Sequence, residues 1–444
     1  MPYKVGLISL GCAKNQINSE QMLWLLNDAG YEIRPDLDGV DAAIINTCGF
    51  IESAKSEAID NILELAQLKK EGKVGKIIVT GCLSERYQAE MLTELPEVDA
   101  VMGVGSYGDI VSVVERVMNG ETVRLFGDKN APVDEFDRVI TTGPGWAYIK
   151  IAEGCDNHCA YCVIPGIRGK YRSRPMENIL REAQELPGLG VRELIVVAQD
   201  ITRYGTDLYG RRTLGELLEK LCAIDGIDWI RLHYLYPDEI DDALIDVIAA
   251  QPKIVKYLDI PIQHINSAVL KRMNRRGTGE DIRALFKKLR ERIPGLVLRT
   301  SLITGLPGEG EAEFEELCEF LREAKIERAG VFPYSPEEGT PAADMPDRCT
   351  QEEAERRAEL ICDIQSRIMD EFNDARIGEE LTVLCEGYDR LAECRYGRSW
   401  ADSPDVDGKV FFTGKGIPGE FVTVRIVDVI DGDLLGETVE PEEN

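Results

Sequence analysis

The chain has 444 residues, more than one hydrophobic core usually organises, so two or three domains are expected. Its 51 Lys and Arg against 80 Asp and Glu give a net charge of −29, which disfavours sequence-independent binding of nucleic acid and favours a basic partner. No apolar run approaches the ~18 residues that span a bilayer, and none forms a signal-peptide core. We therefore expect a cytoplasmic protein without membrane contact, whose twelve cysteines are reduced.

The first 118 residues alternate short apolar runs with segments of helix length. Strands are predicted at Lys4–Ser9, Ala42–Asn46 and Lys76–Thr80, and helices at Ser19–Ala29, Glu52–Lys70 and Ser84–Leu95. This alternation is typical of βαβ units on a parallel sheet.

A cysteine follows each of these three strands. The residues are Cys12, Cys48 and Cys82. Ligands bind outside the carboxyl ends of parallel strands, so we expect the three thiols to lie at one edge and to form a single site. The alternative is three unrelated buried cysteines, because a Cys often packs as a small apolar residue.

Asn119–Gly145 is irregular and rich in Gly, Asp and Pro, as linkers are. A second alternating series follows it. Strands are predicted at Ala147–Ile151, Glu193–Ala198, Trp229–His233, Lys256–Ile260, Leu296–Ile303 and Gly330–Pro333, and helices at Glu177–Leu186, Thr213–Ala223, Asp238–Ala249, Asp281–Arg292 and Ala312–Ala324. Six strand–helix repeats predict a complete or partial α/β barrel with its chemistry at the carboxyl face.

Three more cysteines, Cys155, Cys159 and Cys162, follow the first strand of this series within eight residues. Soft thiolates in a tight loop favour zinc or iron–sulfur. Structural zinc needs four ligands, and the only nearby candidate, His158, is expected to point elsewhere. Three ligands on a four-iron cluster leave one iron open, as a catalytic centre requires.

A charged amphipathic helix is predicted at Gln351–Asn373, and the remaining residues form short strands with Gly-rich turns. These strands are Glu380–Cys385, Leu391–Tyr396, Lys409–Phe412, Phe421–Asp428 and Leu434–Thr438, followed by a frayed end at 440–444. Five such strands predict a small β-barrel. The predicted domains are a cluster-binding domain at 1–118, a linker at 119–145, a core with its bridging helix at 146–373 and the barrel at 374–440.

The C-x-x-x-C-x-x-C spacing, with Tyr161 before the last Cys, resembles the radical S-adenosylmethionine superfamily. Together with Ser9–Asn15 and Arg168–Pro175, it makes the whole chain resemble the methylthiotransferase family of radical enzymes. That resemblance implies an α/β protein: an N-terminal parallel-sheet domain, a partial (β/α)6 radical core and a C-terminal all-β TRAM barrel. It also implies S-adenosylmethionine and two 4Fe–4S clusters. One, on Cys12, Cys48 and Cys82, would handle the inserted sulfur; the other, on Cys155, Cys159 and Cys162, would generate the radical.

Three further stretches resemble the branch of this family that methylthiolates an aspartate β-carbon of ribosomal protein S twelve. They are Ala198–Gly205, Asp259–His264 and Gly397–Asp402. The alternative is the branch that modifies an adenosine of transfer RNA. From Asp374 onward, seven Lys or Arg stand against seventeen Asp or Glu, which suits a basic ribosomal protein, although acidity also confers solubility.

A flavodoxin or ferredoxin-like reductant is expected as a partner, although the sequence does not reveal which, and nucleic acid is expected only through the ribosome. The alternative function from a different class of protein is an iron–sulfur electron carrier without catalysis. Carriers normally close all four ligand positions, so two sets of three cysteines argue against it.

For each of the other candidate residues, the sequence allows a role in the site or a purely structural role. Tyr161 lies against the cofactor's adenine or packs as an ordinary aromatic. Gln199 and Asp200, at the end of a predicted strand, either bind cofactor or substrate or form a cap. Gly305, Gly308 and Glu309 either let the cofactor approach the backbone or form only a turn.

The basic cluster of Arg168, Lys170, Arg172 and Arg174 is predicted to be a local positive patch for the cofactor carboxylate, RNA phosphates or partner acids. His233 and His264 are interpreted as structural. The remaining cysteines are expected not to bind metal: Cys222, Cys318, Cys349, Cys362, Cys385 and Cys394.

Overall fold

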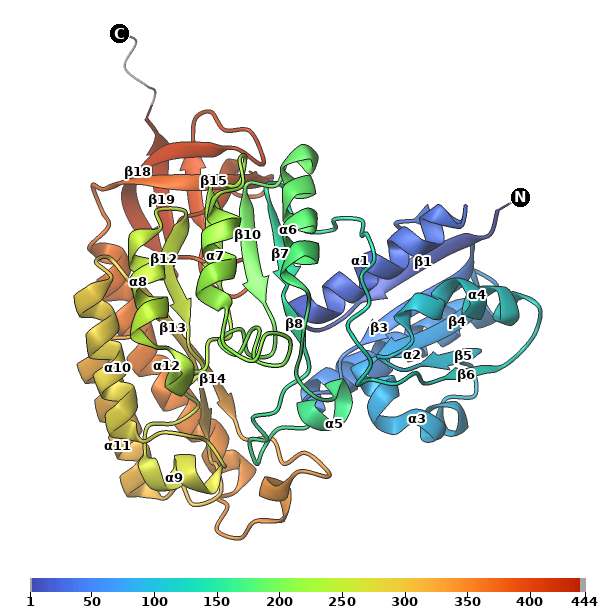
Figure 1. The fold of residues 1–444 in the computed structure, drawn as a ribbon, viewed down its shortest axis with the longest axis horizontal. Coiled ribbons are helices and arrows are strands. Elements are labelled where there is room, and N and C mark those ends of the chain that lie inside the picture. The colour runs from blue at the N-terminus through green and yellow to red at the C-terminus, as the bar shows by residue number, and fades with distance from the viewer. Residues whose placement is uncertain (1, 440–444) are drawn as a thin grey trace. The chain divides into compact units, whose positions relative to one another are not determined.

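The computed structural model describes residues 2–439, and the predicted frayed end at 440–444 lies outside them (Figure 1). The chain forms two compact units. The first comprises Met1–Thr141, Lys150–Asn178 and Ser335–Ala343, and the second Thr142–Ile149, Ile179–Tyr334 and Asp344–Asn444. Of the helices formed by residues 2–439, none combines the length and the apolar character needed to cross a membrane.

The first unit contains a parallel six-stranded sheet in the order β2-β1-β3-β4-β5-β6. Its strands are β1 (Lys4–Ser9), β2 (Glu32–Arg34), β3 (Val40–Thr47), β4 (Val74–Gly81), β5 (Ala100–Met102) and β6 (Val123–Leu125). The three predicted strands are confirmed as β1, β3 and β4. The other three have three residues each, too few for an apolar pattern to be recognised, and β6 lies within the predicted linker.

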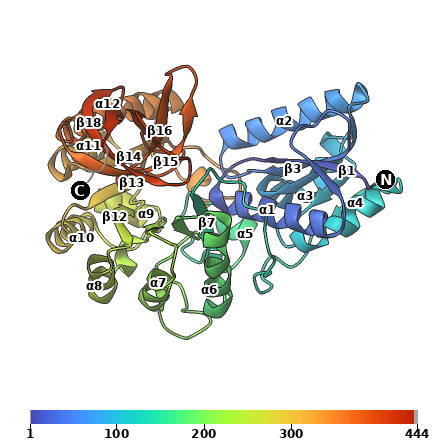
Figure 2. The same cartoon turned by 90° about the horizontal axis from the view of Figure 1, so that it is seen from above.

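Helices cover both faces of this sheet (Figure 2). They are α1 (Ala13–Asp28), α2 (Glu52–Lys70), α3 (Cys82–Glu94) and α4 (Ile110–Met118). Leu26 of α1 and Val113 of α4 belong to one core, whereas Ile62 of α2 and Leu83 of α3 belong to the core on the opposite face. The apolar strands are therefore buried on both sides, as a parallel sheet requires.

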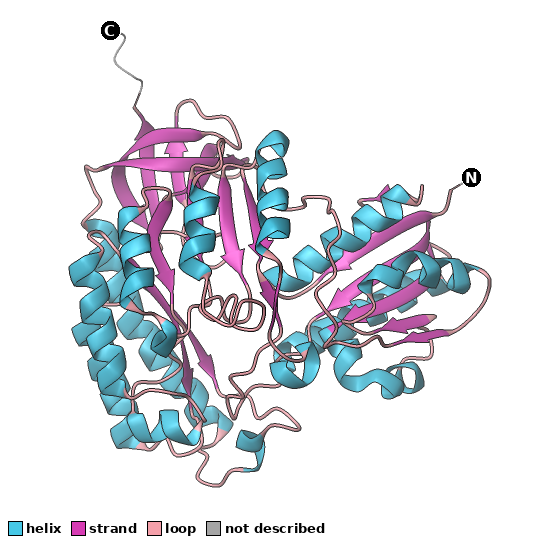
Figure 3. Cartoon of the chain, viewed as in Figure 1, coloured by secondary structure: helices cyan, strands magenta, loops and turns pink. Residues whose placement is uncertain are grey.

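The second unit contains six strands in the order β14-β13-β12-β11-β10-β7, an open sheet that confirms the predicted partial barrel. They are β7 (Trp146–Lys150), β10 (Glu193–Val197), β11 (Trp229–Leu232), β12 (Ile254–Asp259), β13 (Val297–Thr304) and β14 (Arg328–Pro333). The intervening helices are α6 (Met176–Glu185), α7 (Leu214–Cys222), α8 (Asp242–Ala250), α9 (Ser267–Arg272), α10 (Gly279–Arg292) and α11 (Glu311–Ala324). Figure 3 shows helices lying along the outer side of these strands.

Helix α8 begins four residues later than predicted, because Pro237–Glu239 forms a separate short turn. The Asp241 carboxylate then caps α8 by accepting a hydrogen bond from the N–H of Leu244 at 2.9 Å.

Helix α12 (Gln351–Asp374) precedes a closed barrel in the order β15-β16-β17-β19-β18, as predicted. The strands are β15 (Glu380–Asp389), β16 (Cys394–Arg398), β17 (Val410–Thr413), β18 (Phe421–Ile430) and β19 (Asp433–Thr438). Alternate residues such as Leu381, Val383 and Cys385 of β15 fill the barrel, together with Phe412 and Val424.

Buried ion pairs join this barrel to the amino ends of the core strands within the second unit. Glu193, the first residue of β10, accepts hydrogen bonds from Arg231 at 2.7 Å and from Arg398 of β16 at 2.8 Å. Arg328, the first residue of β14, donates to Asp402 at 2.9 Å. Removal of one partner would leave a buried charge without its counter-charge, which is strongly destabilising. These pairs therefore hold the barrel firmly to the core.

Candidate functional site

The first cysteine set lies where predicted, at the carboxyl ends of three neighbouring strands of the first unit. Cys12 follows β1 and precedes α1, Cys48 directly follows β3, and Cys82 follows β4 as the first residue of α3. Strands β1, β3 and β4 are consecutive in the sheet. Parallel strands thus bring together three residues that are far apart in the chain.

Glycines let the loops that carry these thiols pack against one another. Gly11 has φ +88°, and a Cβ placed on it would lie 2.9 Å from the Cβ of Cys48 and 3.3 Å from its Sγ. A Cβ on Gly49 would lie 2.8 Å from the backbone of Leu83. Real Cβ atoms do not tolerate such distances from backbone, so the approach of the loops depends on these glycines.

Buried amides at the start of α1 fix the same loops. The Asn15 amide donates to the carbonyl oxygens of Leu10 at 3.0 Å and Thr47 at 2.9 Å, and the Asn46 amide donates to the Asn15 carbonyl at 2.8 Å. This burial of polar residues explains why α1 begins at Ala13 and not at the predicted Ser19: its first turns lack an apolar face.

The three thiols influence one another electrostatically. Burial raises the pKa of Cys48 to about 11, and the neighbouring Cys82 and Cys12 also raise it. Burial likewise raises the pKa of Cys82, although Arg168 acts in the opposite direction. For Cys12, desolvation is outweighed by the cations of Lys14 and Arg168 and by backbone N–H groups, so its pKa is lowered.

The donor set fits an iron–sulfur group. Among residues 2–439, no group of three or more His, Cys, Asp or Glu side chains is already arranged to hold a metal ion. Three thiols at one edge of the sheet nevertheless supply the soft ligands that such a group requires. The Tyr107 hydroxyl, near Cys82 and Cys12, is buried and has no hydrogen-bond partner among the described residues. A sulfur-containing group would give this hydroxyl an acceptor.

The second cysteine set lies in a loop of the same unit, between β8 (Ala152–Glu153) and α5 (Ile164–Arg168). Strand β8 pairs with β9 (Arg172–Ser173) in an antiparallel ribbon that spans the loop. The Cys155 N–H donates to the Gly169 carbonyl at 3.1 Å, and the Cys162 N–H donates to the Cys159 carbonyl at 3.0 Å. Gly154 has φ +79°, and a Cβ there would lie 2.0 Å from the Lys170 carbonyl oxygen. The loop therefore has a defined backbone path.

A hollow of about 490 Å³ within the first unit lies beside two of these cysteines. Cys159 and Cys162 line it together with Arg86 and Lys129, and His158, which was expected to point elsewhere, lines it as well. This volume is in the range of small-molecule sites. Its two cations are paired, Arg86 with Glu337 at 2.8 Å and Lys129 with Glu85 at 3.5 Å, so the space beside the thiols, and not free positive charge, makes the hollow a candidate cofactor site.

The predicted positive patch is wrong for two of its four members. Arg168 is only 2% exposed, and its guanidinium donates to Asn18 at 3.0 Å, to Asn15 and to the Sγ of Cys82 at 3.4 Å. Arg174 is also buried and donates to the Lys150 carbonyl and to Glu135. Both side chains point inward because buried acceptor groups bind their guanidinium groups there. The run of basic residues in the sequence does not indicate these acceptors.

Sequence reasoning missed the residues that surround Arg168. Besides Asn15 and Asn18, these include Glu153, which lies 3.3 Å from Arg168 and accepts a hydrogen bond from buried Lys150 at 3.0 Å. A usable signal was the polar start of α1, where helical positions that should be apolar are Asn, Ser and Glu.

Tyr161 is half-buried in the three-cysteine loop, in the first unit. Gln199 and Asp200 lie in the second unit, directly after β10. The Asp200 carboxylate accepts hydrogen bonds from the N–H of Thr202 at 3.0 Å and from its hydroxyl, which is the geometry of a turn. A cofactor role for these three residues stays a prediction.

The predicted structural interpretation suits both histidines of the second unit. His233 Nε2 lies 2.9 Å from the Ser403 hydroxyl, and His264 Nε2 lies 3.2 Å from Glu309. Glu309 also accepts hydrogen bonds from the Gly305 N–H and from Arg357, both at 2.9 Å. Burial raises the pKa of Glu309, but these partners outweigh it and the pKa is lowered. Glu309 therefore anchors the Gly305 turn to α12.

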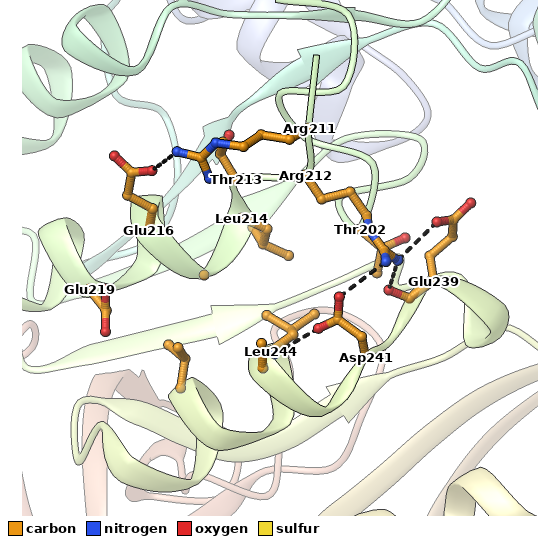
Figure 4. A pocket seen from close by; sticks show the side chains of 13 residues that line it. Thr202, Arg211, Arg212, Thr213, Leu214, Glu216, Glu219, Glu239, Asp241 and Leu244 are labelled. Atoms are coloured by element: carbon orange, nitrogen blue, oxygen red, sulfur yellow. Dashed lines mark hydrogen bonds and ion pairs between the residues drawn. The ribbon is translucent and has the colours of Figure 1, made fainter. Parts of the chain in front are cut away.

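A separate hollow of about 240 Å³ lies between α7 and α8, and no predicted site residue lines it (Figure 4). Its arginines are engaged by neighbouring acids: Arg211 contacts Glu216 at 2.8 Å, and Arg212 contacts Glu239 and Asp241, each at 3.1 Å. These charges are paired and no cysteine lines this hollow, so it offers no ligand for the iron–sulfur group, unlike the hollow lined by Cys159 and Cys162.

Comparisons with protein families agree with this architecture. Residues 149–321 match the radical SAM superfamily, residues 4–103 match the uncharacterized protein family UPF0004, and residues 377–439 match the TRAM domain. The fold resembles that of the radical S-adenosylmethionine methyltransferase TsrM from Kitasatospora setae, with a TM-score of 0.56 and 14% identity over 77% of this chain and 74% of that one. The cobalamin-dependent radical enzyme OxsB gives a TM-score of 0.51 and 12% identity over 82% of this chain and 56% of that one.

An open parallel barrel with a three-cysteine loop, matched to that superfamily, defines the chain as a radical S-adenosylmethionine enzyme, which uses S-adenosylmethionine with an iron–sulfur cluster. The ribosomal protein uS12 methylthiotransferase RimO of Lachnoclostridium phytofermentans is 48% identical to this chain, over 98% of this chain and 99% of the relative. The protein of the same name from Pelotomaculum thermopropionicum is 50% identical, over 99% of this chain and 100% of the relative. The chain therefore belongs to the RimO family of radical methylthiotransferases.

Proposed function

We propose that this enzyme methylthiolates the β-carbon of an aspartate of ribosomal protein uS12, using one 4Fe–4S cluster at each cysteine set. The observation that carries the two-cluster scheme is the contact of Arg168 with Cys82. Arg168 ends the helix that follows Cys162, and Cys82 belongs to the other set, so both sets lie in one compact unit and the segment after the second set contacts the first. The substrate is inferred from relatives that carry the uS12 methylthiotransferase name.

A radical mechanism suits this substrate because the β C–H bond of an aspartate is too weakly acidic for side-chain bases. Cys155, Cys159 and Cys162 would hold the cluster that, with S-adenosylmethionine, would supply the radical chemistry for removing a hydrogen atom. Cys12, Cys48 and Cys82 hold the group that handles the methylthio sulfur. The chain's own contribution is to hold both sets rigidly, which the Asn15 amide and the glycines of the loops support.

Each domain is proposed to have its own role. Residues 1–118 bind the sulfur-handling cluster, 119–145 link, 146–373 form the radical core with its bridging helix, and 374–440 recognise the substrate. Tyr161, Gln199 and Asp200 are proposed to contact the cofactor, and a flavodoxin or ferredoxin-like protein is proposed as the reductant.

Charge favours a protein substrate over nucleic acid. From Asp374 onward, acidic residues outnumber basic ones by seventeen to seven. One of the seven, Arg398, is buried against Glu193, which removes it from any phosphate contact. An acidic barrel attracts a Lys- and Arg-rich ribosomal protein and repels a phosphate backbone.

The test is a parallel assay of the reconstituted enzyme with purified uS12, small ribosomal subunits and transfer RNA, each analysed by mass spectrometry. Methylthio-aspartate in uS12 or in the subunit supports the proposal. A methylthiolated adenosine with unmodified uS12 would instead assign the enzyme to transfer RNA. Absence of 5′-deoxyadenosine under reducing conditions with S-adenosylmethionine would support a non-catalytic electron carrier.

A further inference from the structure

One buried cation of the first unit contacts a cysteine of the first set and ends the helix that follows the second set. Arg168 is 2% exposed, and its Nη2 donates to the Sγ of Cys82 at 3.4 Å, within hydrogen-bonding range for sulfur. The same Nη2 donates to the Oδ1 of Asn15. The second terminal nitrogen, Nη1, donates to Asn18 at 3.0 Å and lies 3.3 Å from Glu153.

These partners orient the guanidinium. Asn15 and Asn18 lie one turn apart on the same face of α1 and contact the two terminal nitrogens separately, which sets the plane of the fork. Glu153, on β8, balances part of the charge and is itself bound by Lys150 at 3.0 Å. With four partners in place, the N–H that faces Cys82 is held there and does not sample solvent.

Such a donor has a known physical effect on a thiolate that binds iron. Hydrogen bonds to cluster sulfurs and nearby positive charge stabilise the reduced, more negative state and so raise the reduction potential. The effect is larger in a buried site, where the local dielectric is low. Arg168 meets both conditions at Cys82.

We propose that Arg168 is a positioning residue that sets the reduction potential of the iron–sulfur cluster held by Cys12, Cys48 and Cys82, through its N–H···S contact with Cys82. This proposal rests on the proposed function, which places a cluster at that set. The proposal extends the proposed function, because it makes Arg168 the residue that determines how readily that cluster accepts an electron. The step concerned is uptake of one electron by the 2+ cluster core to give the 1+ core, with no bond broken.

The test uses the full-length chain with Cys155, Cys159 and Cys162 replaced by Ala, so that iron and redox signals arise from the first set alone. Arg168→Gln and Arg168→Lys are compared with this parent and with a control, Arg174→Gln. Arg174 is a buried arginine of the same segment whose guanidinium binds Glu135 and the Lys150 carbonyl. Iron content is measured first, and the midpoint potential is then measured by anaerobic dithionite titration with redox mediators, followed by electron paramagnetic resonance.

We expect Arg168→Gln to retain iron and to lower the equilibrium constant for reduction at least tenfold, which for one electron is a shift of about 59 mV to more negative potential. Arg168→Lys, which keeps the charge without the fork, should lie between Gln and the parent. Arg174→Gln should match the parent.

Equal midpoints for Arg168→Gln and the parent would overturn the inference and leave the two-cluster scheme intact. Loss of iron from both Arg168 variants would also overturn it, because the residue would then serve assembly and not potential. A parent that binds no iron would instead show that the two-cluster scheme itself is wrong, and the inference with it.

Discussion

Arg168 Nη2 lies 3.4 Å from Cys82 Sγ, although 86 residues separate the two in the chain. Arg168 ends the short helix that follows the loop of Cys155, Cys159 and Cys162, and Cys82 begins the helix that follows β4. One side chain therefore connects the surroundings of both cysteine sets. The proposed function places a metal group at each set, and mutation of each set tests its contribution.

The two cysteine sets should fail in different ways. Cys12→Ala should abolish methylthiolated product but leave S-adenosylmethionine cleavage to 5′-deoxyadenosine, whereas Cys159→Ala should abolish both. Cys222→Ala, in α7 and outside both sets, should retain both activities. Mass spectrometry of the substrate and chromatography of 5′-deoxyadenosine report the two steps. Full product from Cys12→Ala would refute the two-cluster scheme.

Gly11 should be needed for metal binding by the first set. In Gly11→Ala, the new Cβ would lie 2.9 Å from the Cys48 Cβ, so Cys48 must move. We expect several-fold less iron at this set in the background that lacks Cys155, Cys159 and Cys162. Gly30→Ala is the matched control, because Gly30 has a similar φ of +85° but no atom within 4 Å of the added Cβ. Equal iron loss in both variants would point to backbone strain and not to the Cys48 contact.

The buried ion pair between Glu193 and Arg398 should be important for stability. Arg398→Met leaves the buried carboxylate of Glu193 and the partly buried one of Glu386 short of a partner, and should lower the free energy of unfolding of the second unit by about 3–5 kcal/mol. Arg425→Met removes only a half-exposed pair with Glu380 and should cost less than about 1 kcal/mol. Urea denaturation followed by tryptophan fluorescence compares the two. Similar losses would mean that the barrel is not held by this pair.

Stability should fall in acid partly through Glu193. Burial raises the pKa of this carboxyl, but Arg398 and Arg231 outweigh it, so the folded-state pKa lies below the ordinary value of 4.5. A depressed carboxyl pKa stabilises the folded state above that ordinary value, and the contribution is lost as the pH falls toward the folded-state pKa. Glu193→Gln should therefore be less stable than the parent at pH 7, and the difference should shrink below about pH 4.5. Thermal unfolding across this range tests it; a constant difference would contradict it.

Substrate encounter should depend on salt if the acidic barrel attracts a basic protein. Raising monovalent salt from ~0.05 M to ~0.5 M shortens the Debye length from roughly 14 to 4 Å. We expect kcat/KM for uS12 to fall several-fold with little change in kcat, because steering affects association. Steady-state kinetics at constant pH provide the measurement. A kcat/KM that is unchanged by salt would indicate that the acidity of the barrel serves solubility alone.

Much of the fold was predictable because its signals are local. β1 and α2 begin and end at the predicted residues, Lys4–Ser9 and Glu52–Lys70, and the barrel strands were located from short apolar runs between turns. The prediction was weakest where packing overrides pattern. The start of α1 is polar because its amides hold loops, and three-residue strands such as β5 are too short to carry a period of two.

For the site, position along the chain alone predicted that the cysteines group into two sets, one after three neighbouring strands and one within a single loop; their role as metal ligands stays a prediction. Position along the chain could not predict the direction of Arg168 or Arg174. A basic run next to a cofactor loop looks like a surface patch, but partners that are distant in the chain, Asn15 and Glu135 among them, draw these side chains inward. Side-chain direction depends on such partners, and no local pattern encodes them.

The sequence by itself determined the order of strands and helices, the spacing of the thiols and the acidity of the barrel, since each depends on neighbouring residues or on simple counts. Only the tertiary structure decided which charges are buried and which thiol meets a cation. Those outcomes depend on contacts between segments 86 to 205 residues apart, such as Arg168 with Cys82 and Arg398 with Glu193. Burial there turns a weak surface attraction into a strong constraint.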